Sequence, residues 1–321
     1  MIEWPNHEMP WRAWREAMAG SRMHHGWLLA GKAGLGKRAF AEAAARELVA
    51  EAGVSQPKGD HPDILLLTHL PKDDKEENKR DEGKPYEVKR NITIAQIRTM
   101  QHRLTTRPTL GSRRVVIIDP ADDMERNASN ALLKSLEEPP QGTFFLLVAH
   151  RPGRLLSTIR SRCRALRFPL LRDEQIARLL ADEEPQADSN ARDIAIAAAG
   201  GSLGAAKLFI DEELGPIANL MRKIVRDGDP QMDLRGELAR AIGARPNRSR
   251  MQAVFDLARG IVAAEAKQDE GGGRSALIET HVQLVELAAQ APTYNFDSGL
   301  LVMEIGGLLA RSAEASERAD A

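Results

Sequence analysis

A short apolar run that leads directly into a glycine-rich turn and then a helix constrains the fold of this chain more than any other feature. The run is GWLLA at residues 26–30, and the turn occupies residues 31–36. The segment that follows contains AFAEAAARELVAEAG, whose many alanines favour a helix. Strand, turn and helix in this order predict the opening of a βαβ unit.

Strands and helices continue to alternate as far as residue 168. Buried strands are predicted at Val115–Asp119 and Phe144–Ala149, and a short last strand at Leu166–Phe168. Between the first two lies a helix, Asn127–Glu138, which ends at two consecutive prolines. This alternation predicts a parallel α/β sheet that is covered by helices on both sides. Beyond Pro169 only helical periodicity remains, so the predicted fold class is α/β followed by all-α.

The length of the chain, 321 residues, exceeds what one compact core usually holds and predicts two or three domains. The net charge is −1, so no overall basic field indicates nucleic-acid binding, and any contact with DNA requires a local patch or a partner. The chain has a single cysteine, Cys163, which excludes an intramolecular disulfide and a cysteine-based zinc site. We therefore expect no bound metal.

Targeting signals are not evident in the sequence. No apolar run approaches the roughly 18–20 residues that cross a bilayer. The first residues, MIEWPNHEMPW, lack the basic start and apolar core of a signal peptide. We expect a cytoplasmic protein with no membrane contact.

A highly charged segment occupies residues 72–90. It contains seven basic and seven acidic residues and almost no apolar ones. A segment of this composition cannot form part of a core. It is predicted to be a mobile surface loop.

The glycine-rich turn fits the pattern G-x-x-x-x-G-K of a phosphate-binding loop (P-loop). The backbone N–H groups around Gly31, Gly34 and Gly36 can surround a phosphate, and Lys37 can pair with the β- and γ-phosphates of a nucleotide. The next position normally carries a serine or threonine hydroxyl that binds Mg²⁺. Here it is Arg38, which cannot bind a cation. The sequence predicts a P-loop fold whose nucleotide site is degenerate.

The strand at residues 115–119 supplies the second half of a nucleotide site. Asp119 stands where a carboxylate would bind Mg²⁺. A P-loop ATPase with this strand requires an acidic residue directly after Asp119, which orients the attacking water. In this chain the next residue is Pro120. We expect no ATP hydrolysis by this chain, while weak binding of ATP or ADP without hydrolysis stays open.

A longer stretch identifies the family. Residues 130–163 contain NALLKSLEEPP, the apolar strand FFLLVA, and HRPGRLLSTIRSRC. This stretch resembles the AAA+ clamp-loader family of DNA replication. The resemblance implies an AAA+ domain over residues 1–170, a small helical lid domain over 171–210, and a C-terminal helical collar over 211–321. It also implies that Arg162 is an arginine finger, which reaches into the ATP site of a neighbouring subunit.

Two departures from the family pattern concern the chain's own ATP site and zinc. The lid motif of the ATPase subunits carries an arginine where this chain has Gly204. The four-cysteine zinc module that many relatives carry before the His-Pro-Asp at residues 61–63 is absent. Within the family, the chain most resembles the delta-prime subunits of the bacterial DNA polymerase III clamp loader, and this resemblance implies a non-hydrolysing, stator-like role.

This resemblance implies specific partners. They are the gamma or tau ATPase subunit, the delta subunit, the sliding clamp, and primed DNA contacted through the complex. The DNA polymerase III holoenzyme, to which such a clamp loader belongs, is a DNA-directed DNA polymerase. No polymerase active site is evident in this chain. Two alternatives stay open. The chain could be an active clamp-loader or RuvB-like AAA+ ATPase, or an AAA+ adaptor without a role on DNA.

Overall fold

The computed structural model describes residues 4–20, 23–269, 273–294 and 297–320. The chain divides into two compact units, Met1–Leu170 and Leu171–Ala321. The first unit contains the sheet and the second is helical, so the predicted fold class is confirmed. The division of the second unit into lid and collar at residue 211 stays a prediction.

A parallel five-stranded sheet forms the centre of the first unit among the described residues, in the order β2-β3-β4-β1-β5. Its strands are β1 (Gly26–Ala30), β2 (Ile64–Leu67), β3 (Arg114–Ile118), β4 (Thr143–Ala149) and β5 (Arg164–Arg167). The three central strands are almost wholly apolar and buried, because helices cover both of their faces. Because the strands are parallel, the residues after β1 and after β3 lie at the same end of the sheet, on either side of the end of β4.

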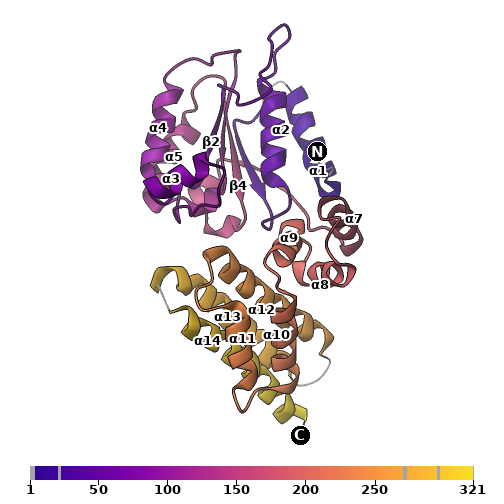
Figure 1. The fold of residues 1–321 in the computed structure, drawn as a ribbon. Helices are drawn as coiled ribbons and strands as arrows, with labels where there is room; N and C mark the ends of the chain where they lie inside the picture. Colours follow the sequence, from indigo (N-terminus) through magenta and orange to yellow (C-terminus); the bar gives the residue numbers. More distant parts are fainter. Residues whose placement is uncertain (1–3, 21–22, 270–272, 295–296, 321) are drawn as a thin grey trace. The chain divides into compact units, whose positions relative to one another are not determined.

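Helices lie on both sides of this sheet (Figure 1). The helices of the first unit are α1 (Glu8–Ala19), α2 (Lys37–Val49), α3 (Asp74–Asp81), α4 (Ile94–Leu104), α5 (Arg126–Glu137) and α6 (Ser157–Arg160), with short 3₁₀ turns at Pro5–His7, Ala121–Asp123 and Pro152–Arg154. Helices α1 and α2 cover one face, while α4 and α5 pack against each other over the other face. An aromatic cluster fills the first interface: Trp14 contacts Trp27 and Phe40, and all three side chains are fully buried.

The structure corrects the prediction for residues 72–90. The segment is exposed, as expected, but it contains helix α3 and not only a loop. The Asp73 side chain caps this helix by accepting the N–H of Glu76, and Glu76 accepts the N–H of Glu87 and pairs with Lys79. Charge alone predicts a solvated segment, whereas a cap and pairs three residues apart stabilise a helix without any apolar face.

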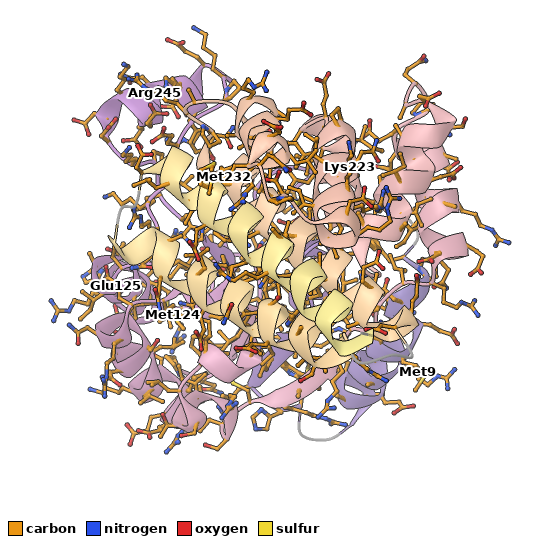
Figure 2. The ribbon with its side chains drawn as sticks, turned by 90° about the horizontal axis from the view of Figure 1, so that it is seen from below. Met9, Met124, Glu125, Lys223, Met232 and Arg245 are labelled. Atoms are coloured by element: carbon orange, nitrogen blue, oxygen red, sulfur yellow. The ribbon has the colours of Figure 1, made fainter. Side chains whose placement is uncertain are left out.

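The second unit consists of helices over its whole described length. They are α7 (Asp173–Glu183), α8 (Ser189–Ala199), α9 (Leu203–Asp211), α10 (Gly215–Asp227), α11 (Asp233–Ile242), α12 (Arg248–Gln268), α13 (Arg274–Tyr294) and α14 (Ser298–Asp320). Helices α10, α11 and α14 pack together, as do α12, α13 and α14. Met232 and Lys223 are exposed on this unit (Figure 2). None of the described helices is both long enough and apolar enough to cross a membrane.

Candidate functional site

The glycine-rich turn joins β1 to α2 and has the backbone of a P-loop. Gly34 and Gly36 have φ angles of 75° and 73°, a conformation that favours glycine. Gly31 lies against the end of the sheet, where an added Cβ atom would stand 2.7 Å from the Phe168 carbonyl oxygen. The three predicted glycines are therefore required by the shape of the turn itself.

Lys37, the first residue of α2, turns back into this loop. Only 2% of the residue is exposed, and Nζ donates to the carbonyl oxygens of Gly31 and Lys32, at 2.8 and 2.5 Å. Burial lowers the pKa of Lys37 to about 8, although the carboxylates of Asp119 and Asp122 oppose this shift. The ammonium group that would bind a phosphate is thus held by the loop's own carbonyls.

Arg38 faces the carboxylate that follows β3. Its Nη1 lies 3.7 Å from Oδ2 of Asp119, and its Nε donates to Glu42 at 2.9 Å. Asp119 is 8% exposed, and burial raises the pKa of its carboxyl group while the charges of Arg38 and Lys37 oppose the shift. In a working site a hydroxyl and this carboxylate would share Mg²⁺. Here a guanidinium group is tethered beside the carboxylate instead.

The acidic residues after Pro120 have structural partners. Asp122 accepts the backbone N–H groups of His150 and Arg151, at 2.8 and 2.9 Å, and so joins the ends of β3 and β4. Asp123 pairs with His69 at 3.3 Å. Burial, with the charge of Lys37, lowers the pKa of His150 to about 4, so this side chain is neutral near pH 7. Asp122 is thus engaged in holding the chain and not in orienting water.

Residues near the N-terminus lie on the P-loop, which the sequence did not predict. His7 is 4% exposed and its Nε2 donates to the Leu35 carbonyl oxygen at 2.8 Å. Its ring stacks on Trp4, with ring centres 5.4 Å apart, and burial lowers its pKa. A Cβ atom added to Gly36 would stand 2.4 Å from the Trp4 ring. The only signal in the sequence was a polar pair, Asn6 and His7, next to several tryptophans.

Arg162 lies just before β5, at the edge of the sheet. Its side chain is 36% exposed; Nη1 donates to the Thr158 carbonyl oxygen at 2.9 Å, and Nη2 lies 2.6 Å from Oε1 of Glu137. The backbone at this point packs closely on β1, since a Cβ atom on Gly26 would stand 3.0 Å from the Arg162 carbonyl oxygen. The neighbouring thiol, Cys163, has its pKa raised to about 12 by burial, which makes it unreactive.

The sheet separates Arg162 from the P-loop of the same chain. In the pairing of β1 with β5, Trp27 stands opposite Arg164 and Ala30 opposite Arg167. The P-loop begins after Ala30, whereas Arg162 precedes Arg164. At about 3.3 Å per residue the two lie roughly 15–20 Å apart along the strands, which an arginine side chain does not span. The structure thus brings together Gly31, Gly34, Gly36, Lys37, Arg38 and Asp119, and leaves Arg162 at the opposite end.

Two further predictions concern the lid motif around Gly204 and a bound metal. Ser202 is fully buried and caps α9 by accepting the N–H of Ala205 at 3.1 Å, and Gly204 lies in the first turn of this helix. Glycine has no side chain with which to contact a phosphate. Within the described ranges, no three His, Cys, Asp or Glu side chains come together in a group that could hold a metal ion.

Comparisons with known proteins place the chain among the subunits of DNA polymerase III. A family model described as DNA polymerase III, delta subunit, matches residues 6–172. The chain is 37% identical over 196 residues to DNA polymerase III subunit delta' of Pseudomonas aeruginosa, covering 56% of this chain and 55% of that protein. It is 31% identical over 201 residues to the Escherichia coli subunit delta', covering 58% and 54%. The matched part spans about half the length of these curated relatives.

Solved structures show more distant similarity. A DNA polymerase III gamma subunit-related protein of Thermotoga maritima is 20% identical with a TM-score of 0.45, and the match covers 96% of this chain and all of that one. The RuvB Holliday junction branch migration motor of the same organism is 17% identical with a TM-score of 0.44, covering 94% and 85%.

Proposed function

The chain belongs to the family described as DNA polymerase III, delta subunit, and from this premise we propose that it is the non-hydrolysing, stator-like delta' subunit of a clamp loader. In this role it supplies Arg162 to the ATP site of a neighbouring subunit and helps to load the sliding clamp onto primed DNA. The observation that carries the proposal is the distance along the sheet between Arg162 and the chain's own P-loop. An arginine placed in this way can stabilise a phosphate only on another subunit.

Several contacts support the absence of hydrolysis. Arg38 supplies no hydroxyl for Mg²⁺ and stands beside Asp119, while Lys37 binds carbonyls of its own loop. Pro120 occupies the position of the catalytic acid. The loss of one positioned general base costs about 10²–10⁴-fold in rate, and here the metal ligand is also missing. Nucleotide could still bind weakly at the loop, without turnover.

The proposed partners follow from the family and its relatives. DNA polymerase III subunit tau of Escherichia coli is 29% identical over 198 residues, covering 60% of this chain and 30% of that protein. We place the chain beside a gamma or tau subunit and the delta subunit in the cytoplasm, with the clamp and primed DNA contacted through the complex. Arg162 then stabilises the negative charge that develops on the neighbour's γ-phosphate, an effect worth about 10³–10⁵-fold in comparable phosphoryl transfers.

The first test uses the isolated chain and its complex. The purified chain should release no phosphate from ATP with Mg²⁺, and it should form a stable complex with the gamma or tau and delta subunits in size-exclusion chromatography. Turnover by the isolated chain at about 1 s⁻¹ or more, a rate typical of competent enzymes, would instead identify an active ATPase. Failure to join the complex would favour an adaptor without a replication role.

A further inference from the structure

Two contacts hold the guanidinium group of Arg162 in place. One is the hydrogen bond from Nη1 to the Thr158 carbonyl oxygen in its own helical turn, and the other is the ion pair of Nη2 with Glu137, the last residue of α5. Both side chains of the ion pair are partly exposed, at 36% and 48%. An arginine has five N–H donors, so these contacts leave donors free for a phosphate.

The charge around Arg162 makes the ion pair with Glu137 important. Arg160 and Arg164 stand two residues to either side of Arg162, and residues 151–167 contain no acidic residue. Like charges this dense disfavour any single fixed position of a long, flexible side chain. Glu137 supplies a carboxylate from a different element, α5, and so favours one orientation of Arg162 among its cationic neighbours.

Glu137 stands on a well-anchored part of the chain. The residue before it, Leu136, is 1% exposed, and its carbonyl oxygen accepts a hydrogen bond from Nε2 of His25 at 2.8 Å. The next residue, Glu138, continues the helical hydrogen bonds to Lys134 at 3.0 Å, and two prolines follow. The carboxylate of Glu137 thus projects from a helix end that is fixed on both sides, as a positioning group requires.

We propose that Glu137 is a positioning residue for Arg162: it orients the guanidinium group toward the phosphate bound by the neighbouring subunit. This inference rests on the proposed function of Arg162. Because the ion pair is partly exposed, its loss should reduce the Arg162-dependent part of the ATPase rate by about two- to fivefold, the range of an exposed ion pair. The effect should fall on the maximal rate and leave the KM for ATP nearly unchanged, because Glu137 does not itself contact the nucleotide.

The experiment uses the clamp loader reconstituted with the gamma or tau and delta subunits, with clamp and primed DNA present. Phosphate release is compared for wild type, Glu137→Gln, Glu137→Asp, Arg162→Ala and the double variant Glu137→Gln/Arg162→Ala. Glu138→Gln is the matched control, because Glu138 is exposed, adjacent, and without an ion pair in the described part of the chain. Size-exclusion chromatography checks that all complexes assemble equally.

We expect Glu137→Gln to lower the rate, Glu137→Asp to restore part of it, and Glu138→Gln to match wild type. The double variant should be no slower than Arg162→Ala, because Glu137 acts only through Arg162. An unchanged or faster rate for Glu137→Gln, with Arg162→Ala slow, would overturn the positioning role and leave the proposed function standing. If Arg162→Ala is itself unchanged, both the finger and its positioning residue are wrong.

Discussion

The buried ammonium group of Lys37 makes a stability prediction that depends on pH. The pKa of Lys37 falls from its ordinary value of 10.5 to about 8 in the folded chain. Between these values the folded form has lost the proton that the unfolded form still holds, so unfolding takes up a proton and the free energy of unfolding rises with pH. A difference of about 2.5 pKa units corresponds to a total change of about 3 kcal/mol in the free energy of unfolding. About 2 kcal/mol of this increase should appear between roughly pH 7 and pH 9.5.

Lys37→Met isolates this contribution, because methionine keeps most of the side-chain volume without the charge. Urea unfolding of both proteins at several pH values gives the difference in their free energies of unfolding, and wild type should gain about 2 kcal/mol on the variant over this window. Lys134→Met, at an exposed position of α5, is the control for the removal of one lysine charge. A pH-independent difference for Lys37→Met would refute the buried, loop-bound state of this lysine.

Three further predictions concern stability. Arg114→Leu should lower the free energy of unfolding by about 3–5 kcal/mol in urea titrations, because it leaves the fully buried carboxylate of Asp63 without its cation; a loss below about 1 kcal/mol would contradict this. Gly36→Ala should cost about 1–3 kcal/mol, since it adds strain at a positive φ and a clash with Trp4, and calorimetry should show the cost reduced when Trp4→Ala is added. Replacing residues 75–84 by a short Gly-Ser linker should change the stability by about 1 kcal/mol or less and leave assembly intact, because the ion pairs of α3 are exposed or lie within the segment; loss of assembly would make α3 an interaction element.

The central sheet and the P-loop could be predicted from the sequence because their signals are local. Short apolar runs such as residues 115–118 and 144–149, rich in β-branched or aromatic residues, favour buried strands, and the shape of the turn requires the glycines that the motif contains. The nucleotide site could likewise be recognised as degenerate, since Arg38 and Pro120 are read directly from the chain.

Contacts between distant segments could not be predicted in the same way. The polar pair Asn6 and His7 beside the tryptophans does not specify that Trp4 and His7 lie on Leu35 and Gly36, because that contact depends on how the chain before α1 packs on the first unit. Glu137 and Arg162, which form an ion pair, are 25 residues apart in the chain. The sequence contains many other arginines, and it does not show which of them pairs with Glu137. Helix α3 was missed because its stability comes from a cap and charge pairs and not from an apolar face.

The central claim is that this chain acts on ATP bound by its neighbour and not on its own. It is tested most directly by the DNA-stimulated ATPase rate of the reconstituted complex with wild type, Arg162→Ala or Arg162→Lys at equal assembly. We expect Arg162→Ala to lower the total rate partially, because one site loses a finger worth several kcal/mol while other sites keep theirs. Arg162→Lys should not restore the rate fully, since an ammonium group lacks the planar fork of guanidinium. Equal rates for all three complexes would contradict the claim and make Arg162 a structural residue.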